Sequence, residues 1–115
     1  VEGVYFSDHY HPDAPVTQVS KKFVEAFVKK YGVKPSTLSA LGYDAYMLIV
    51  SAIERAKTTK PELIATAIRS IKNFQGATGA ISIDKEGNAQ KEIVILKVKN
   101  GDFVYSGKLN TNVLK

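Results

Sequence analysis

The sequence contains no cysteine and no tryptophan, only one methionine, and no long hydrophobic run. Without cysteine, the chain can form neither a disulfide framework nor a thiol nucleophile. The longest apolar run covers residues 45–50, far short of the roughly 20 residues that a membrane-spanning helix requires. The chain has 115 residues, of which 44% are hydrophobic and 23% are charged. This composition is typical of a globular domain rather than of a disordered or low-complexity segment.

The charge of the chain is basic but dispersed. Lysine and arginine number 16 against 11 aspartates and glutamates, which gives a net charge of +5 and a pI near 9.4. Adjacent basic residues occur only at 21–22 and 29–30. A nucleic-acid-binding domain gathers its cations on one face, among elements that read bases. We therefore expect no nucleic-acid partner and an ordinary solvated surface.

We expect a short, buried apolar strand at residues 4–7 and a polar loop at 8–15. Three amphipathic helices are expected to follow. The first helix spans residues 16–31, where apolar residues recur at three- and four-residue spacing, and Gly32 ends it. The second runs from residue 35 or 36 to residue 56, and its broad apolar stripe predicts packing on more than one side. Thr59 is expected to cap the third, in a Thr-Lys-Pro-Glu signal.

The remainder of the chain is rich in residues that favour strands. A glycine-punctuated link at 74–79 leads to a strand at 80–83, and a turn at 84–88 leads to a strand at 92–98. Asn100-Gly101 is the strongest hairpin signal and joins that strand to a last one at 103–105. This order predicts an α/β or α+β fold with three helices, a C-terminal β-hairpin and no internal repeat.

The residues that could carry chemistry are few. His9 and His11, flanked by Asp8 and Asp13, resemble a metal cluster, but all four lie in one loop and no distant ligand completes them. We therefore favour an exposed polar loop and expect no metal. The segment 76–79 lacks the Gly-Lys-Ser/Thr ending of a phosphate loop, and 84–88 lacks the later acid of a calcium loop, so both are interpreted as turns. No Gly-x-Ser-x-Gly elbow occurs, and we expect neither enzymatic activity nor a cofactor.

Asp44 is the one acidic residue in an apolar setting, because it follows Tyr43 early in the second expected helix. Two structural interpretations remain open for it: stabilisation by the helix dipole and a hydrogen bond to a neighbouring loop. A functional interpretation also remains open, namely a contact with a ligand or with a hinge between lobes.

Several motifs in a fixed order point to a known family. They are Phe27-Val-Lys-Lys-Tyr-Gly32 followed by Pro35, Ala40-Leu-Gly-Tyr-Asp-Ala45, Ala52-Ile-Glu-Arg-Ala56, Phe74-Gln-Gly-Ala-Thr-Gly79, Ile83-Asp-Lys-Glu-Gly-Asn88 and Val98-Lys-Asn-Gly-Asp-Phe103. In this order they resemble the periplasmic solute-binding proteins of the branched-chain amino acid type, the type I binding proteins of ABC importers. No single motif is decisive, but the series covers nearly the whole chain.

The resemblance implies an α/β, Rossmann-like architecture of two lobes joined by three crossings, of which this chain matches only the C-terminal third. Segments 1–8 and 92–115 would then resemble strands of the C-terminal lobe. Segment 9–91 would resemble helices of the N-terminal lobe with a hinge crossing. The chain begins Val1-Glu2-Gly3 without a recognisable signal peptide, which we interpret as mature or excised sequence.

The resemblance also implies candidate site residues. Leu38 falls where the family places an apolar side chain against the ligand, with Ser39 beside it; ordinary core packing is the alternative for Leu38. Asp8 and His9 would lie at the hinge crossing. Tyr43 and Asp44 match the helix motif and are expected to be mainly structural.

The function implied is capture of a branched-chain or related amino acid by the extracytoplasmic, periplasmic binding component of an ABC importer, with a membrane permease as its partner. The alternative is the ligand-binding module of a sensor or receptor on the same fold. A free-standing flavodoxin-like domain that binds phosphate is disfavoured, because no glycine-rich strand-to-helix turn occurs. A third of a two-lobed protein should also expose apolar surface, so we expect self-association.

Overall fold

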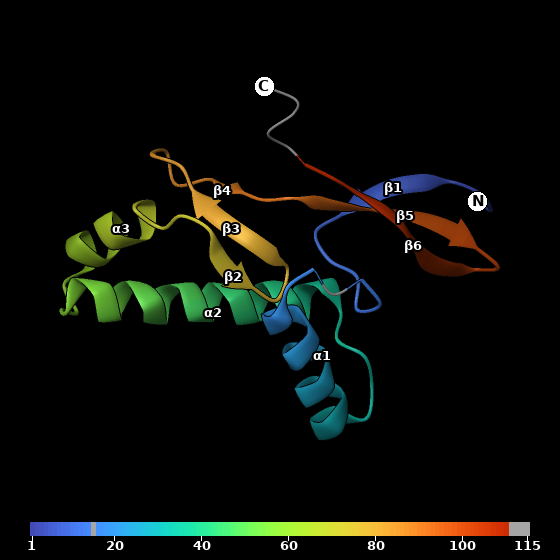
Figure 1. The fold of residues 1–115 in the computed structure, drawn as a ribbon, viewed down its shortest axis with the longest axis horizontal. Helices are drawn as coiled ribbons and strands as arrows, with labels where there is room; N and C mark the ends of the chain where they lie inside the picture. Colours follow the sequence, from blue (N-terminus) through green and yellow to red (C-terminus); the bar gives the residue numbers. More distant parts are fainter. Residues whose placement is uncertain (15, 111–115) are drawn as a thin grey trace.

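The computed structural model describes residues 1–14 and 16–110, and it divides them into two parts (Figure 1). The helical part contains α1 (Gln18–Tyr31), α2 (Thr37–Ala56), α3 (Pro61–Arg69) and an antiparallel sheet of β2 (Phe74–Gly76), β3 (Gly79–Ile83) and β4 (Ala89–Gln90). The β1–β5–β6 sheet contains β1 (Tyr5–Asp8), β5 (Ile93–Lys99) and β6 (Asp102–Leu109), also antiparallel, with β5 in the middle.

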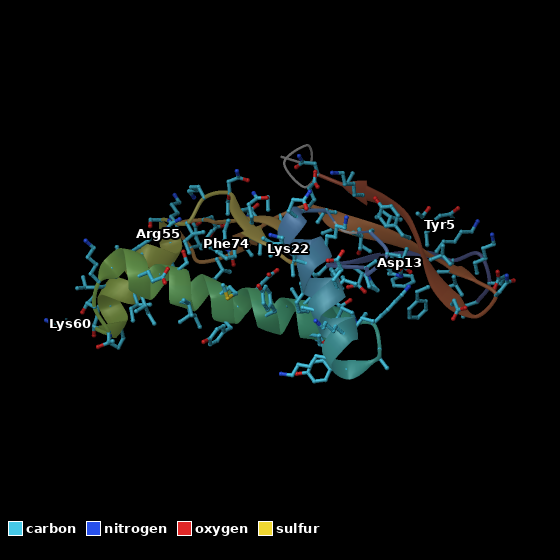
Figure 2. The ribbon with its side chains drawn as sticks, turned by 60° about the horizontal axis from the view of Figure 1, so that its bottom comes forward. Tyr5, Asp13, Lys22, Arg55, Lys60 and Phe74 are labelled. Atoms are coloured by element: carbon cyan, nitrogen blue, oxygen red, sulfur yellow. The ribbon has the colours of Figure 1, made fainter. Side chains whose placement is uncertain are left out.

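Two segments join the parts: one leads from β1 to α1 and the other from β4 to β5 (Figure 1). The resulting molecule is elongated, measuring 50 × 39 × 21 Å. Its radius of gyration is 15.7 Å, larger than the roughly 13 Å typical of a compact chain of about 100 residues. In Figure 2, Tyr5 marks the end that carries the β1–β5–β6 sheet and Lys60 marks the opposite end.

The first two helices lie close to where their capping residues predict them. α1 begins at Gln18, two residues after the predicted start, because the Thr17 hydroxyl caps it by accepting a hydrogen bond from the Ser20 N–H at 2.9 Å. Gly32 ends α1 with a left-handed φ of 71°. The Ser36 hydroxyl caps α2, which continues to residue 56 as predicted.

The predicted cap of the third helix is wrong. The N-cap of α3 is Lys60 rather than Thr59, and no side chain caps this helix. Pro61 explains the difference, because proline is favoured at the first helical position and therefore places the cap at the residue before it.

The glycine-punctuated link is shorter than predicted, because its first three residues form a strand. β2 pairs with β3 in a register that places Gly76 opposite Gly79, so only Ala77 and Thr78 remain as the turn. The C-terminal hairpin is confirmed: Asn100 and Gly101 both have left-handed φ values, 54° and 81°, as a type I′ turn requires. β6 extends beyond the predicted 103–105 because backbone pairing with β5 continues across a bulge near Gly107.

The expected burial of the first strand is wrong for the described chain. β1 is an edge strand, and the Tyr5 side chain is exposed. Val94 and Leu96 of the neighbouring strand β5 are buried, and two small clusters of buried residues lie mainly in the helical part. One contains Tyr10, Ala40 and Ala77 against Phe23 and Val24; the other contains Ile71, Ile81 and Ile83 against Leu48, Ile68 and Phe74.

Two further points bear on the sequence expectations. Pro15 of the predicted loop, and residues 111–115 of the segment 92–115, lie outside the described residues. Among the helices that are described, none combines the length and the apolar character needed to cross a membrane.

Candidate functional site

A cleft of about 950 Å³ lies where the two parts of the molecule meet. Its lining comes from three places in the sequence: the segment that follows β1, the residues that lead into α2, and the β5–β6 hairpin. The lining residues are Asp8, Tyr10, His11, Pro12, Asp13, Pro35, Ser36, Thr37, Leu38, Leu96, Asp102, Phe103, Val104 and Tyr105. The cleft therefore brings together residues that are almost 100 positions apart.

The two predicted ligand residues lie in the first turn of α2 but are placed differently. Leu38 lines the cleft and is 80% exposed. Ser39 is not part of the lining; its hydroxyl lies 3.0 Å from the Ser36 hydroxyl, and its N–H donates to that same oxygen. The first turn of α2 thus presents an apolar side chain to the cleft, while Ser39 contributes to the cap of the helix.

The two predicted hinge residues lie where β1 ends and the chain leads on towards α1: Asp8 is the last residue of β1, and His9 follows it. Asp8 lines the cleft, and its carboxylate accepts hydrogen bonds from the His9 N–H and from the Thr37 hydroxyl at 3.1 Å. His9 lies outside the lining, but its carbonyl accepts a hydrogen bond from the Lys91 ammonium at 3.1 Å. Thr37 therefore ties the segment after β1 to α2, and Lys91 ties it to the second joining segment.

Lys91 is held in partly buried surroundings. Burial lowers the pKa of its ammonium group to about 8, although the carboxylates of Asp44 and Asp8 act in the opposite direction by favouring the charge. Sequence reasoning singled out neither Lys91 nor Thr37, because both act through contacts with residues at least 27 positions away.

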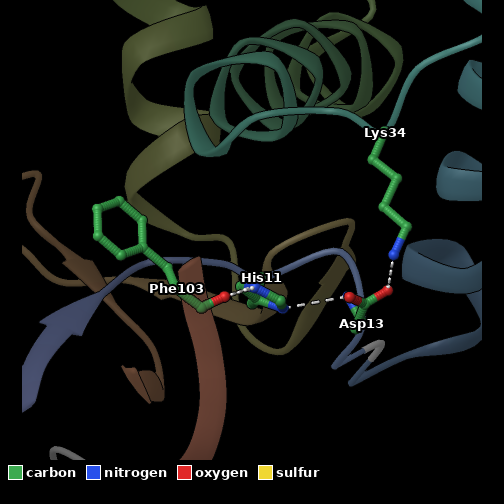
Figure 3. A network of polar contacts seen from close by, with 4 residues as sticks. All are labelled: His11, Asp13, Lys34 and Phe103. Atoms are coloured by element: carbon green, nitrogen blue, oxygen red, sulfur yellow. Dashed lines mark hydrogen bonds and ion pairs between the residues drawn. The ribbon is translucent and has the colours of Figure 1, made fainter. Parts of the chain in front are cut away.

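A second set of polar contacts lies on the cleft side of the same segment (Figure 3). The His11 Nε2 atom lies 3.0 Å from the carbonyl oxygen of Phe103 in β6, and His11 Nδ1 lies 3.3 Å from the Asp13 nitrogen. The Asp13 carboxylate forms an ion pair with Lys34, which precedes α2. Sequence reasoning weighed His11 as a metal ligand, favoured an exposed polar loop for it, and did not foresee its contact with β6. Among the described residues, no group of three or more histidine or acidic side chains is placed to hold a metal ion.

Tyr43 and Asp44 lie away from the cleft lining, where they hold elements of the helical part together. Asp44 is only 2% exposed, and its carboxylate accepts hydrogen bonds from the Ala77 and Thr78 N–H groups and from the Thr78 hydroxyl, at 2.6 to 2.8 Å. The structure thus shows the hydrogen bond to a neighbouring loop that was one interpretation of Asp44. The centroid of the Tyr43 ring lies 4.8 Å from the centroid of the Phe23 ring in α1.

Gly76 makes room for the Asp44 carboxylate. A Cβ atom at Gly76 would lie 2.7 Å from one carboxylate oxygen of Asp44, closer than side-chain carbons approach. The Gly76 carbonyl also accepts a hydrogen bond from the Thr17 hydroxyl at 2.8 Å. The β2–β3 turn is therefore tied both to α2 and to the start of α1.

The cleft lining combines acidic side chains with apolar surface. Its described lining contains three carboxylates, those of Asp8, Asp13 and Asp102, together with apolar surface from Leu38 and Phe103, but no lysine or arginine. Such a surface can contact an apolar group and attract an ammonium group. A carboxylate on the same ligand finds no cationic partner in this lining.

Comparison with known proteins places these features in a family. The periplasmic binding protein family model matches residues 1–102. The structure superposes on the leucine-binding protein LivK of Thermotoga maritima with a TM-score of 0.90 and 49% identity, covering 98% of this chain and 32% of that one.

Two other solved structures give a similar result. An ABC transporter substrate-binding protein of Desulfitobacterium hafniense in complex with Leu matches with a TM-score of 0.84 and 32% identity, over 91% of this chain and 31% of that one. LivJ of Streptococcus pneumoniae, a branched-chain amino acid transporter substrate-binding protein in complex with isoleucine, matches with a TM-score of 0.82 and 27% identity, over 94% and 30%.

The chain thus spans about a third of the length of these proteins. Its helices and sheets form a mixed α/β fragment of the type I periplasmic-binding-protein fold. The match of the family model over most of the chain is decisive: the chain belongs to the periplasmic binding protein family.

Proposed function

We propose that the chain is part of the solute-binding component of an ABC importer that captures leucine or a related amino acid without bond chemistry. The observation that carries this proposal is the cleft, with the exposed Leu38 side chain at its wall. The 49% identity to a leucine-binding protein over nearly the whole chain supports the ligand class.

The proposal includes an assignment of segments to two lobes. Segments 1–8 and 92–115 belong to the C-terminal lobe, and segment 9–91 belongs to the N-terminal lobe with its hinge crossing. The division between the β1–β5–β6 sheet and the helical part supports this assignment. Closure of two such lobes would hide the ligand from water. The ligand would favour the closed state because it makes more contacts there than in the open state.

The chain provides only part of the contacts that an amino acid needs. Apolar contact with Leu38 contributes at most about 2 kcal/mol, and one hydrogen bond in the first turn of α2, where Ser39 lies, contributes about 1 kcal/mol. Micromolar affinity requires about 8 kcal/mol, and a buried amino acid needs partners for both of its charges. The missing partner for the carboxylate must therefore come from the remaining two thirds of the protein.

A chimera tests the proposal. The 115 residues replace the matching third of the Thermotoga maritima leucine-binding protein, and calorimetry measures binding of a panel of apolar, acidic and basic amino acids. We expect leucine-like ligands to bind best and Leu38→Ala to weaken them by about tenfold. Leu63→Ala, which removes an exposed leucine outside the cleft, is the matched control. A folded chimera that prefers charged amino acids would contradict the proposal.

The transport role extends the proposal to a partner and a location. A binding component of an importer works outside the cytoplasm and docks on a membrane permease, whereas a receptor on the same architecture would be fused to a membrane-spanning or signalling domain. The reading frame around these 115 residues distinguishes the two roles directly.

We also expect the isolated chain to self-associate. Several apolar side chains of α2 and α3 are exposed, namely Leu38, Tyr43, Tyr46, Ile49 and Leu63, and exposed apolar surface favours association. Light scattering of the chain at high concentration should report a dimer or larger species. A monomer at every concentration would contradict this expectation.

A further inference from the structure

The Thr37 hydroxyl, in the first turn of α2, faces two acceptors on the segment that leads away from β1. It lies 3.1 Å from a carboxylate oxygen of Asp8 and 3.3 Å from the carbonyl oxygen of Tyr10. A carboxylate and a carbonyl can only accept, so the hydroxyl is the donor in both contacts. It has a single proton, which it can share between the two acceptors or give to either one.

The two acceptors belong to different parts of the molecule. Asp8 is the last residue of β1 and pairs with Val94 of β5, so it moves with the β1–β5–β6 sheet. Tyr10 is only 3% exposed and packs in a cluster with Ala40 of α2, so it moves with the helical part. The Thr37–Asp8 hydrogen bond therefore crosses from one part to the other, whereas the Thr37–Tyr10 hydrogen bond stays within the helical part.

His9 is the residue that connects these two attachment points, and it is therefore the natural pivot for a movement of the two parts. Its carbonyl is contacted from the other joining segment by the Lys91 ammonium, at 3.1 Å. A rotation about the pivot changes the distance from Thr37 to Asp8 but leaves Tyr10 in place on α2. The Thr37–Asp8 hydrogen bond is therefore a contact that opposes such a rotation.

The same hydrogen bond fixes residues of the cleft lining relative to one another. Asp8, Thr37 and Leu38 all line the cleft. Leu38 is 80% exposed, so its position depends on the backbone of the first turn of α2, which Thr37 ties to the end of β1. A further contact to the sheet, from His11 to Phe103, starts in the loop and does not involve α2. Holding a contact residue in place before the ligand arrives lowers the cost of ordering it during binding.

We propose that Thr37 is a positioning residue for ligand capture: its hydrogen bond to Asp8 holds the first turn of α2, and with it Leu38, at a fixed place relative to the β1–β5–β6 sheet. The inference rests on the proposed function for its ligand, while the link between α2 and β1 is a property of this chain. Thr37 acts through the position of Leu38 and not by contact with the ligand.

Valine and serine at position 37 separate the hydroxyl from the shape of the side chain. Thr37→Val keeps the branched shape and removes the donor, whereas Thr37→Ser keeps the donor and removes a methyl group. Thr66→Val is the matched control, because the Thr66 hydroxyl donates to the Glu62 carbonyl within α3 at 2.9 Å and lies outside the cleft lining. Each valine variant loses one hydroxyl hydrogen bond, so a difference between them depends on where that bond lies.

The first experiment measures the link without any ligand. Because the chain has no cysteine, Tyr46→Cys in α2 and Lys99→Cys at the end of β5 place one spin label on each part, at exposed positions outside the cleft lining. Pulsed electron paramagnetic resonance, with labelled chain diluted in unlabelled chain, then gives the distribution of distances between the labels. Thr37→Val should broaden or shift this distribution, while Thr37→Ser and Thr66→Val should leave it unchanged. An unchanged distribution in Thr37→Val, or an equal change in Thr66→Val, would overturn the proposal.

The second experiment measures capture of leucine by the chimera, at a temperature at which every variant is folded. We expect Thr37→Val to raise the leucine dissociation constant about three- to tenfold. Thr37→Ser and Thr66→Val should stay within about twofold of the unchanged chimera. A chimera that binds no amino acid would defeat the proposed function, while the distance measurement would still decide the link between α2 and β1.

A double-mutant cycle tests whether Thr37 acts through Leu38. If it does, Thr37→Val should change the leucine dissociation constant by less than about twofold in the Leu38→Ala background, because two residues that act as a unit do not contribute additively. A general loss of stability, or a separate contact of Thr37 with the ligand, would instead give the same fold-change in both backgrounds. Equal fold-changes would therefore overturn the positioning role.

Discussion

The helical part and the β1–β5–β6 sheet differ in where their side chains find partners. In the helical part, the buried Asp44 carboxylate receives three hydrogen bonds from one turn, and Ile71, Ile81 and Ile83 pack on one another. In the sheet, β6 is exposed along nearly its whole length, and Tyr5 and Phe103 remain largely exposed.

This difference shows that the helical part contains the hydrogen-bonding and packing partners of its own buried side chains. A buried carboxylate is tolerated only where its partners are in place, so the α2–turn contact specifies a definite local structure within the chain. Exposed aromatic side chains on a three-stranded sheet are instead typical of a surface that packs against further chain or a partner. Breaking the internal contacts of the helical part should therefore cost more stability than changes in the sheet.

The largest effect is expected from Asp44→Ala. This change leaves the N–H groups of Ala77 and Thr78 buried without an acceptor, and each such loss costs about 1 to 3 kcal/mol. We expect the free energy of unfolding, measured by urea titration, to fall by at least about 3 kcal/mol. Asp84→Asn is the control, since the Asp84 carboxylate accepts hydrogen bonds at the largely exposed β3–β4 turn, from Asn88 and from Gln90 at the end of β4. Equal losses in the two variants would show that the buried Asp44 contacts contribute no more to stability than those of an exposed turn.

A smaller loss is expected from Gly76→Ala. The added methyl group would lie within 2.8 Å of the Asp44 carboxyl atoms, and overpacking of this kind costs about 1 to 3 kcal/mol. Gly107→Ala is a sharp control, because a Cβ at Gly107 in β6 meets nothing within 4 Å. Urea unfolding should show Gly107→Ala as neutral. If Gly76→Ala were equally neutral, the close approach of Asp44 would not contribute to stability.

The smallest effect is a pH dependence that comes from Lys91. In the unfolded chain its ammonium has the ordinary pKa of 10.5, whereas burial lowers the pKa to about 8 in the folded chain. Between these values the unfolded state binds more protons, so the free energy of unfolding should rise with pH. Urea titrations from pH 7 to 9.5 should show this rise, and Lys91→Met should flatten it. Lys85→Met, at an exposed position, should not; an unchanged slope in Lys91→Met would contradict the assignment.

Local signals in the sequence predicted much of the fold. Gly32 and Ser36 mark helix ends through their own backbone and hydroxyl groups, and Asn100-Gly101 requires a tight turn. β2 was missed because its three residues become a strand only by pairing with β3. The burial of β1 was overestimated because apolar residues in a sequence indicate that a strand can be buried, but they do not show which other segment would pack against it.

The candidate site was predictable only in part. The motif series placed Leu38 at a binding surface and Asp8 at a joining segment, and both line the cleft. The opposite wall was missed, because the contact of His11 with Phe103 spans 92 positions and leaves no local pattern. Asp44 shows the same limitation: its apolar setting marked it as unusual, but only the structure identified the turn 33 and 34 positions away that it binds.

The central claim is that these residues form part of a binding cleft that is completed by the rest of the protein. The most direct measurement is calorimetric titration of leucine into the 115-residue chain, alone and mixed with the remaining two thirds of the Thermotoga maritima leucine-binding protein. We predict affinity no better than millimolar for the chain alone and micromolar affinity for the assembled mixture. Micromolar binding by the chain alone, or an assembled mixture that does not bind leucine, would contradict the claim.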